Sequence, residues 1–431
     1  MADNVLVLGG GLAGVGCAIK LGDEGVPVTL VDRNDYHQFQ PLLYQVATSQ
    51  LPAEDIARPH RVIFESFPSV EILTADVTAA DLSERTLRLA DGRTLTGSHV
   101  VMAAGAKPNF FGVPGAADHA FPLYSVADAE RLRRHLQELI QAAASSGDPE
   151  RGSLDVVVVG GGPTGVETTG ALAELMRALQ QVGHVEQDGR ITLVDRGSRL
   201  LGGFSDKSHE YAHAKLTEAG ADIRLGRGVT AVHADRVELD DGDAIETRTV
   251  VWGGGESGGD VAQSAGPTLG RGGRFDVQPD LTVEGYPGVY AVGDVANIPD
   301  PDGEPLPQLG SVAQQSGRWA AENILRDRGG EERQPFRYKD KGIMAMIGRN
   351  AAVAEVGRRR HQVDGPVAFA AWLGVHAMLL SGAHSKTDAF LNWAWDYFDR
   401  DHTATVEAAS EPKRIAWGDH PDDLPTITVD S

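Results

Sequence analysis

A strand, a glycine turn, a helix and a second strand that ends in an acid occur twice in this chain of 431 residues. The first copy is NVLVLGGGLAGVGCAIKLGDEGVPVTLVD, and the second opens with DVVVVGGGPTGVETTGALAEL and closes with ITLVD. In such a unit the first Gly permits a tight turn, the second lets the backbone approach a pyrophosphate, and the third lets helix pack on strand. The helix N-terminus then faces the phosphates, and the acid accepts hydrogen bonds from a ribose. The expected cofactor-binding residues are Gly9, Gly11, Gly14 and Asp32 in the first unit and Gly160, Gly162, Gly165 and Asp195 in the second.

The repetition continues beyond the glycine turns. The strand VVMAAG at residues 100–105 is matched 150 residues later by VVWGGG, and each follows a hairpin with an Asp-Gly turn. These strand ends add Ala104, Gly105 and Gly254 to the expected cofactor-binding residues. The duplication predicts an α/β fold with two Rossmann-like dinucleotide-binding domains, and two unrelated glycine loops are the alternative.

Composition excludes several classes of function. The chain holds 61 acidic and 39 basic residues, a formal charge of −22, which excludes the basic stripe of a nucleic-acid-binding protein. A single cysteine, Cys17, excludes a disulfide framework, a Cys-rich zinc site and an internal dithiol redox pair. No metal-binding residues are expected. We interpret Cys17 as a small buried residue of the first helix. The N-terminus has neither the basic nor the apolar region of a signal peptide, and no apolar run is clean enough to predict a transmembrane helix.

A third element distinguishes the two domains. The segment TVEGYPGVYAVGDVA predicts a strand that ends in Gly293-Asp294. This resembles the two-dinucleotide-binding-domain, glutathione-reductase-like flavoproteins, in which such an Asp holds the ribityl chain of FAD. The resemblance implies an FAD-binding domain formed by residues 1–118 and 268–330, an inserted NADH-binding domain at 119–267, and a C-terminal segment at 331–431. Asp195 favours NADH over NADPH because its carboxylate would repel a 2′-phosphate, although Arg196 and Arg199 follow it.

The segment DRNDYHQFQPLLYQVATSQLPAEDIARP resembles the same region of type II NADH dehydrogenases, the single-subunit, non-pumping NADH:quinone oxidoreductases of respiratory chains. Further similar stretches follow in register: GGGPTGVETTGALAEL, LPQLGSVAQQSGRWAAENI, FRYKDKGIMAMIGR and LNWAWDYF. The resemblance implies FAD and NADH as cofactors and a membrane quinone as electron acceptor. A soluble FAD-dependent reductase of a protein electron carrier and a flavin-based redox-sensing scaffold are the alternatives.

Two residues are expected to be catalytic. The resemblance implies that Glu167 lies near the nicotinamide and the reactive edge of the flavin, where it orients the cofactor or delivers a proton to the quinone. The alternative for Glu167 is a first-turn acid favoured by the helix dipole. Gln315 lies on a helix that is expected to begin near Ser311, and the resemblance implies that the free N–H groups at the start of this helix point at the flavin. The side-chain amide of Gln315 is expected to donate a hydrogen bond to a quinone carbonyl.

The quinone pocket is expected to include neighbours of these groups. Relatives often have a second Gln where this chain has Ser311, and Gln314 is a candidate substitute. Gln40 is expected to begin an uncharged wall beside the flavin, which suits a quinone. The expected pocket residues are Tyr44, Gln45, Ser311, Gln314, Gln315 and Lys341.

Aromatic residues are dense in residues 366–398, where Phe369, Trp372, Leu373 and His376 form the stripe of an amphipathic helix. The resemblance implies that this segment associates with the membrane surface, on the cytoplasmic face, as a peripheral, monotopic anchor. Nearby acidic residues outnumber basic ones, so binding would depend on apolar burial rather than charge. Core helices or dimer-forming helices are the alternative, and a homodimer remains open.

Overall fold

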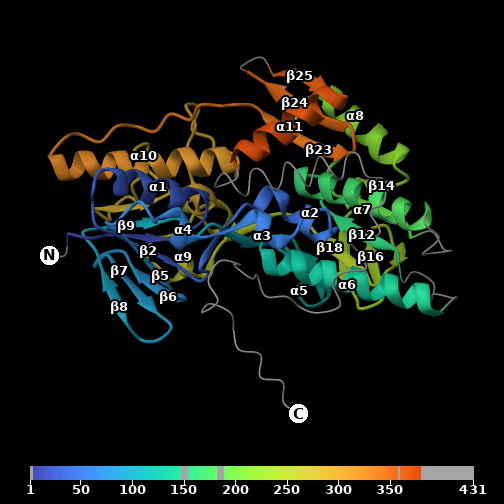
Figure 1. The fold of residues 1–431 in the computed structure, drawn as a ribbon, viewed down its shortest axis with the longest axis horizontal. Helices are drawn as coiled ribbons and strands as arrows, with labels where there is room; N and C mark the ends of the chain where they lie inside the picture. Colours follow the sequence, from blue (N-terminus) through green and yellow to red (C-terminus); the bar gives the residue numbers. More distant parts are fainter. Residues whose placement is uncertain (1–2, 147–153, 182–188, 358–359, 380–431) are drawn as a thin grey trace, which may run out of the picture.

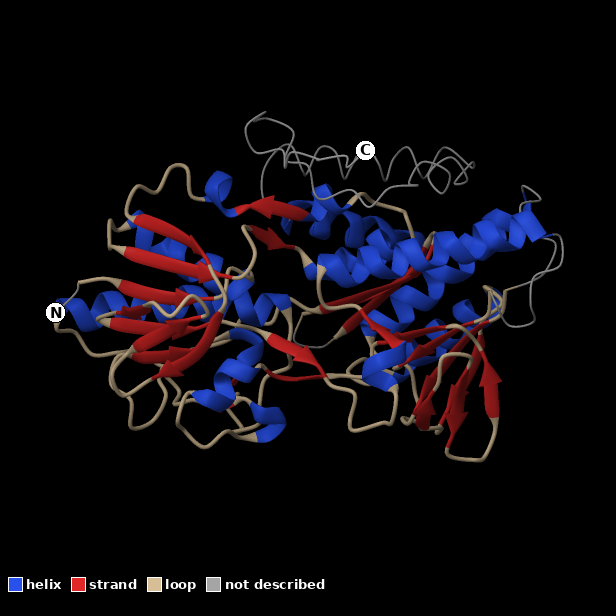
Figure 2. Ribbon diagram, turned by 90° about the horizontal axis from the view of Figure 1, so that it is seen from below, coloured by secondary structure: helices blue, strands red, loops and turns tan. Residues whose placement is uncertain are grey.

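The computed structural model describes residues 3–146, 154–181, 189–357 and 360–379. Two five-stranded parallel sheets lie side by side along the long axis of the molecule (Figures 1 and 2). The first has the order β21-β9-β1-β2-β5, with all neighbours parallel. Its strands are β1 (Val5–Leu8), β2 (Val28–Asp32), β5 (Val70–Thr74), β9 (His99–Met102) and β21 (Val289–Ala291). Helices α1 (Leu12–Asp23) and α10 (Gly310–Gly329) pack together over this sheet (Figure 1).

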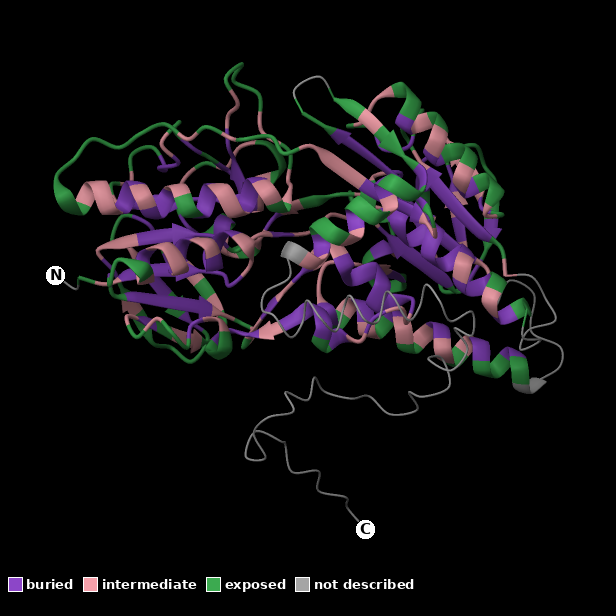
Figure 3. Cartoon of the chain, turned by 45° about the horizontal axis from the view of Figure 1, so that its top comes forward, coloured by how far each residue is buried: buried purple, intermediate pink, exposed green. Residues whose placement is uncertain are grey.

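The second sheet repeats the design with the order β11-β18-β12-β13-β14, again all parallel. Its strands are β11 (Ala120–Pro122), β12 (Val156–Val159), β13 (Ile191–Asp195), β14 (Asp222–Leu225) and β18 (Thr249–Trp252). The accompanying helices are α6 (Val126–Ser146), α7 (Pro163–Gln181) and α8 (Asp206–Glu218). Strands β1 and β12 are buried along their whole length, as expected where both faces of a parallel sheet are covered (Figure 3).

A three-stranded antiparallel sheet precedes β9 in the first domain, and a second one precedes β18 in the second domain. The first consists of β6 (Val77–Asp81), β7 (Thr86–Leu89) and β8 (Thr94–Thr96), and the second of β15 (Val229–Val232), β16 (Arg236–Leu239) and β17 (Ala244–Glu246). The expected Asp-Gly turns have Gly92 at φ +88° and Gly242 at φ +89°, a conformation that a side chain would strain. The internal repeat therefore extends from the glycine turns to these hairpins.

The chain leaves the first sheet after β9 and returns to it with β21, so the second sheet is inserted within the first domain. The two crossings pair with one another as an antiparallel ribbon of β10 (Ala106–Pro108) and β19 (Glu256–Gly258). The α/β fold with two Rossmann-like domains, the second inserted, is confirmed. The short remaining elements are β3 (Tyr36–Gln38), η1 (Gln40–Leu42), α2 (Leu43–Ala47), α3 (Ala53–Ile56), β4 (Ala57–Pro59), α4 (His60–Ile63), α5 (Ala116–His119), α9 (Asp260–Ser264), η2 (Arg271–Gly273), β20 (Phe275–Asp276), η3 (Gly293–Val295) and β22 (Ala296–Asn297).

The C-terminal part forms an antiparallel sheet of β23 (Ile343–Gly348), β24 (Ala351–Val356) and β25 (His361–Asp364), followed by α11 (Gly365–Leu379). This sheet packs directly on α7. A Cβ on Gly170 would lie 1.9 Å from the Ile347 carbonyl oxygen, so only a glycine permits this approach. Residues 380–398, which include the remaining predicted membrane-associating aromatics, lie outside the described residues.

Helix α11 differs from its expected role. Trp372 and His376, the centre of the predicted amphipathic stripe, are buried, and Phe369 and Leu373 pack against the same core. This face is therefore a core face, as the alternative interpretation had it, because the segment at residues 36–48 and the C-terminal sheet together supply its apolar partners. The opposite face exposes Val367 by 68%. In the described part of the chain, no helix combines the length and the apolar character needed to span a bilayer.

Candidate active site

The first glycine turn is shaped by three different constraints. Gly9 has φ +105°, and a Cβ there would lie 2.3 Å from the carbonyl oxygen of Ala103. A Cβ on Gly14 would lie 1.8 Å from the Gly9 carbonyl oxygen, whereas one on Gly11 would meet nothing within 4 Å. Helix α1 then begins at Leu12 with no side-chain cap on its first N–H groups. Gly9 and Gly14 thus serve packing, and Gly11 leaves the helix N-terminus open to an anion.

The second turn reproduces this geometry. Gly160 has φ +114°, and its Cβ would lie 2.4 Å from the Gly253 carbonyl oxygen. A Cβ on Gly165 would lie 1.8 Å from the Gly160 carbonyl oxygen, and one on Gly162 would meet nothing within 4 Å. Both turns therefore fit a dinucleotide pyrophosphate. The carbonyl oxygens that Gly9 and Gly160 approach belong to Ala103 and Gly253. The residues that follow these two, Ala104 and Gly254, are expected cofactor contacts.

The two acids at the strand ends brace their glycine turns. The backbone N–H of Gly10 donates to Asp32 Oδ2, and that of Gly161 donates to Asp195 Oδ2 at 2.6 Å. A carboxylate has about four acceptor positions, so each acid retains capacity for a ribose hydroxyl. The predicted ribose acids thus stand beside the phosphate-binding turns in both domains.

The arginines after Asp195 are directed elsewhere. Arg199 forms an ion pair with Asp206 at the start of α8. Arg196 folds over the backbone of Gly228, where a Cβ would lie 2.7 Å from its Nε. Neither contact presents a guanidinium to a 2′-phosphate, so the geometry favours NADH, as the sequence predicts.

Two buried histidines beneath the first turn were missed by sequence reasoning. His37 Nδ1 lies 2.9 Å and His60 Nε2 lies 3.2 Å from the carbonyl oxygen of Gly10. Burial lowers the pKa of His37 to about 4 and also lowers the pKa of His60. Both rings are therefore neutral near pH 7 and hold the turn from below as hydrogen-bond donors. The pairing of β3 with β4, which brings them together, has no sequence signal of its own.

Gly105 serves the domain crossing as well as the predicted cofactor contact. It has φ +69°, and a Cβ there would lie 2.6 Å from the hydroxyl of Tyr124. The backbone N–H of Ala106 donates to that hydroxyl at 2.7 Å. Tyr124 thus fastens the first crossing strand to the linker before α6, and it is a site residue that sequence reasoning did not identify.

Asp294, the predicted ribityl ligand, lies in an acidic neighbourhood. Burial raises its pKa to about 6, and the charge of Arg274 opposes that shift. Burial, followed by the charge of Asp294, raises the pKa of Glu256 to about 7. Glu256 and Arg274 therefore belong to the same site, although they are far from Asp294 in sequence.

The uncharged stretch after β2 is held at both ends. Gln40 Nε2 donates to the Tyr124 carbonyl oxygen at 3.2 Å. Tyr44 and Gln45 are buried, and Gln45 Nε2 donates to Tyr44 Oη at 3.1 Å. The Tyr44 ring meets Trp372 of α11 edge-on, with centroids 6.4 Å apart. Gln40 therefore faces the domain crossing, while the other two lie beneath α11.

Glu167 is a buried carboxyl at the contact of three elements. Its Oε1 accepts the Met346 backbone N–H of β23 at 3.0 Å. Burial raises its pKa to about 8, although the Met346 hydrogen bond and the Trp372 side chain favour the charged form. A carboxyl titrating near neutral pH is suited to proton transfer.

The predicted pocket residues on α10 and in the segment after it have different surroundings. The Ser311 and Tyr338 hydroxyls lie 2.8 Å apart. Gln315 Nε2 donates to the Lys339 carbonyl oxygen at 3.1 Å, and its Oε1 accepts the Lys339 N–H at 3.0 Å. Gln314 lies against α1, where a Cβ on Gly16 would be 3.9 Å from its Cγ, and Lys341 is exposed.

Comparison with known proteins agrees with this architecture. Residues 3–317 match the family model described as pyridine nucleotide-disulphide oxidoreductase. The chain is 35% identical to the type II NADH:quinone oxidoreductase Ndh of Mycobacterium tuberculosis, over 90% of this chain and 87% of that protein. It is 30% identical to the type II NADH:quinone oxidoreductase of Staphylococcus saprophyticus, over 82% and 89% respectively.

Solved structures show the same fold. NDH2 of Plasmodium falciparum in complex with NADH superposes with a TM-score of 0.86 at 17% identity, covering 93% of this chain and 100% of that one. The sulfide:quinone oxidoreductase of Aquifex aeolicus gives 0.74 at 20% identity, covering 93% and 96%. The chain therefore belongs to the pyridine nucleotide-disulphide oxidoreductase family and, within it, to the type II NADH:quinone oxidoreductases.

Proposed function

We propose that this chain oxidises NADH through bound FAD and reduces a membrane quinone without pumping protons. The observation that carries the proposal is the pair of matching glycine turns, each open at its middle glycine. A buried carboxyl, Glu167, follows the second turn on α7, and burial raises its pKa to about 8. An internal redox-active dithiol is excluded, because the chain has one cysteine. Cys17 is buried, and burial raises its pKa to about 12. Electrons that enter from NADH therefore do not pass through a thiol of this chain on their way to the acceptor.

Residues of both domains share the binding of the cofactors. In the proposal, Asp32 and Asp294 hold FAD while Asp195 holds the adenosine ribose of NADH. Bound FAD supplies the two-electron chemistry, accepting a hydride and passing both electrons to the quinone. The first N–H groups of α10, which no side chain caps, favour negative charge at their end of the site.

Glu167 is the proposed proton donor. One NADH supplies a hydride, which is two electrons and one proton, so the quinol needs one further proton from the protein or solvent. A carboxyl with a pKa of about 8 holds that proton at pH 7. The proposed acceptor pocket consists of Glu167 together with Tyr44, Gln45, Ser311, Gln314, Gln315 and Lys341. Gln315 keeps one amide hydrogen for a quinone carbonyl beyond its bond to Lys339.

Membrane association is proposed through the exposed side of the C-terminal part. Four exposed valines lie on β24, β25 and α11, namely Val356, Val363, Val367 and Val375. Apolar side chains of this kind can enter a lipid interface without positive charge. The proposed location is the cytoplasmic face of the cell membrane, with the chain peripheral and monotopic. A homodimer is the proposed assembly, and the molar mass in solution tests it.

Steady-state NADH oxidation by the FAD-loaded protein tests this function. A panel of short-chain and long-chain quinones, ferricyanide and protein electron carriers is compared with and without lipid vesicles. We expect quinones to be the best acceptors, with vesicles raising the rate for long-chain quinones. A preference for a protein carrier would support a soluble reductase instead, and slow turnover with every acceptor would support a redox-sensing scaffold.

A further inference from the structure

Two buried histidines meet at a single carbonyl oxygen beneath the first glycine turn. His37 Nδ1 lies 2.9 Å and His60 Nε2 lies 3.2 Å from the carbonyl oxygen of Gly10. A carbonyl oxygen only accepts, so each of these ring nitrogens carries the hydrogen of its bond. Burial lowers the pKa of both rings, so both are neutral at pH 7. The two imidazoles therefore occupy both acceptor positions of this one carbonyl.

The two rings come from separate elements that the fold brings together. His37 lies on β3 and is buried, and His60, which begins α4, is 0% exposed. The pairing of β3 with β4 holds these elements side by side, and the His60 N–H donates to the Asp35 carbonyl oxygen at 2.8 Å. A Cβ on Gly10 would lie 2.3 Å from His60 Nε2, so the ring packs directly against the turn.

The orientation of the Gly10 carbonyl determines where the next N–H points. The Gly10–Gly11 peptide is trans, and in a trans peptide the C=O and the following N–H point in opposite directions. With its carbonyl toward the histidines, this peptide directs the Gly11 N–H away from them. In the described part of the chain no acceptor bonds to that N–H, and a Cβ on Gly11 would meet nothing within 4 Å. The histidines thus present a backbone donor at the start of α1, where an anion binds.

The second domain fixes the corresponding peptide without side chains. The Gly161 carbonyl oxygen, which corresponds to that of Gly10, accepts the Leu201 backbone N–H at 2.7 Å. In both turns the N–H of the same glycine donates to the strand-end acid, Asp32 or Asp195. The two domains therefore share a fixed peptide at this point and differ in what fixes its carbonyl, two imidazoles in the first and one backbone N–H in the second.

We propose that His37 and His60 are positioning residues for FAD, which hold the Gly10–Gly11 peptide with its N–H toward the cofactor pyrophosphate. This inference rests on the proposed binding of FAD by the first domain. It assigns to the two imidazoles a contribution to FAD retention that does not extend to NADH, because the turn of the second domain is held by its own backbone.

Matched pairs of variants separate the hydrogen bond from the packing of the rings. An Asn at position 37 can place an N–H close to that of Nδ1, whereas Leu has nearly the same shape and no N–H. A Gln at position 60 can likewise reproduce the Nε2 donor, whereas Met has a similar length and no donor. The pairs are His37→Asn with His37→Leu, and His60→Gln with His60→Met.

Release of FAD from the purified holoenzyme at pH 7 is followed by the rise in flavin fluorescence after dilution. We expect His37→Leu and His60→Met each to raise the rate constant for release at least fivefold over the parent. His37→Asn and His60→Gln should stay within twofold of the parent, because they keep a donor for the Gly10 carbonyl. The KM for NADH, measured with excess FAD and ferricyanide as acceptor, should stay within twofold in all four variants.

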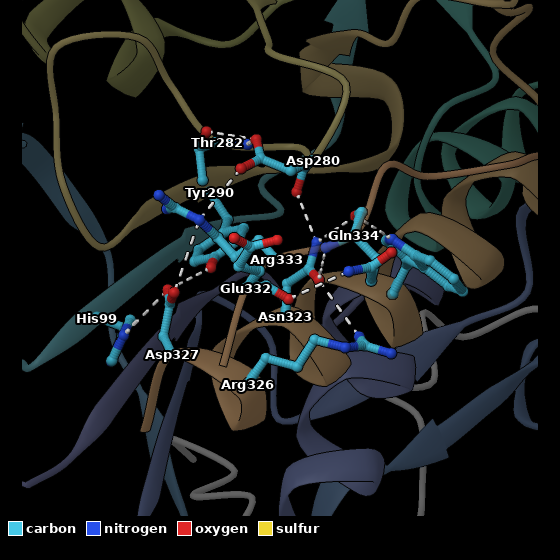
Figure 4. Close-up of polar contacts among 11 residues, drawn as sticks. His99, Asp280, Thr282, Tyr290, Asn323, Arg326, Asp327, Glu332, Arg333 and Gln334 are labelled. Atoms are coloured by element: carbon cyan, nitrogen blue, oxygen red, sulfur yellow. Dashed lines mark hydrogen bonds and ion pairs between the residues drawn. The ribbon is translucent and has the colours of Figure 1, made fainter. Parts of the chain in front are cut away.

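His99 supplies the control at the opposite end of the same sheet. It begins β9 and is in register with Val5, the first residue of β1, whereas the glycine turn follows the last residue of β1. Its Nε2 lies 3.8 Å from Asp327 Oδ2 of α10 (Figure 4), and its Nδ1 lies 3.1 Å from Ser98 Oγ. His99→Met therefore removes a largely buried histidine from this domain without changing the turn, and it should leave FAD release within twofold.

Three results would contradict the inference. Equal FAD release within both pairs, or within the one pair whose variants fold, would show that the hydrogen bonds do not retain the cofactor. Release from His99→Met as fast as from His60→Met would show that general loosening of the domain explains the effect. If His37→Leu and His60→Met kept the parent's FAD release and instead raised the KM for NADH, the assignment of FAD to the first domain would be wrong, and the inference with it.

Discussion

Glu167 of α7 and Met346 of β23 are joined by a buried hydrogen bond of 3.0 Å between the carboxylate Oε1 and the backbone N–H. The bond connects the second Rossmann-like domain to the C-terminal sheet at residues separated by 179 positions. Because the acceptor is a titratable group that burial disfavours in its charged form, both stability and activity should depend on its protonation.

Glu167→Gln should stabilise the protein increasingly as pH rises. The folded-state pKa of about 8 lies above the ordinary value of 4.5, so the folded parent binds more protons than the unfolded chain between these values. The parent therefore loses stability from Glu167 as pH rises through this window, by on the order of a few kcal/mol, whereas Gln does not titrate. Thermal unfolding at pH 5, 7 and 9 measures the difference in Tm between variant and parent.

Glu355→Gln is the control with the opposite sign. Burial opposes ionisation of Glu355, but hydrogen bonds from the Ser205 N–H and the Ser208 hydroxyl prevail and lower its pKa. The stabilisation that ionised Glu355 gives the folded state is present above its unfolded-state pKa and is lost as pH falls. Relative to the parent, Glu355→Gln should therefore be destabilised most near neutral pH. Equal Tm differences at all pH values for Glu167→Gln would contradict the raised pKa.

Quinone reduction should decline as pH rises through about 8, because Glu167 then loses the proton that it donates. Glu167→Gln should have a lower rate at pH 7 and should lack this limb of the profile. Stopped-flow reoxidation of reduced flavin by quinone measures the step directly. A profile in Glu167→Gln identical to that of the parent would exclude Glu167 as the donor.

The middle glycines should report which domain binds which cofactor. A Cβ at Gly11 or Gly162 meets no protein atom within 4 Å, so either change to Ala should leave the fold intact and obstruct only a ligand. We expect Gly11→Ala to lower the FAD content of the purified protein. Gly162→Ala should keep FAD and raise the KM for NADH about tenfold, equivalent to ~1.4 kcal/mol.

Gly14→Ala is the contrasting variant, because its Cβ would lie 1.8 Å from the Gly9 carbonyl oxygen and should destabilise the domain itself. Flavin absorbance, NADH kinetics and thermal unfolding separate the three results. Loss of FAD from Gly162→Ala would reverse the assignment of the domains.

Asp195 should set the preference for NADH. Asp195→Asn keeps an acceptor for the Gly161 N–H but removes the charge that repels a 2′-phosphate. We expect the ratio of kcat/KM for NADPH to that for NADH to rise about tenfold, or ~1.4 kcal/mol. Arg199→Ala, which breaks an ion pair with Asp206, should change that ratio little. A parent that used both cofactors equally would disprove the preference.

The two faces of α11 should separate stability from membrane binding. Trp372 is fully buried, so Trp372→Ala should lower the free energy of unfolding by ~3–5 kcal/mol. Val367 is 68% exposed, so Val367→Glu should change it by less than ~0.5 kcal/mol. Val367→Glu should nevertheless reduce cosedimentation with lipid vesicles, because a charge enters the proposed interfacial side. Undiminished vesicle binding would argue against this face.

Local patterns in the sequence determined both Rossmann-like units, because the glycine turns, the strand-ending acids and the Asp-Gly hairpins are short-range features with direct steric causes. Gly9 and Gly160 illustrate this, since each approaches the strand-end carbonyl of its own domain in the same way. The same reasoning placed Cys17 in the core and the start of α10 near Ser311, and the structure confirms both.

Only the tertiary structure decided what the side chains contact over long distances. An apolar stripe such as that of α11 has the same sequence pattern whether it faces lipid or protein. The packing of Trp372 against residues 36–48 shows that this face of α11 contacts protein. Likewise, nothing near His37, Glu256 or Tyr338 in sequence indicates their partners at Gly10, Asp294 and Ser311. Periodicity records the conformation of one segment, whereas burial, pKa and hydrogen-bond partners depend on which distant segments the fold brings against it.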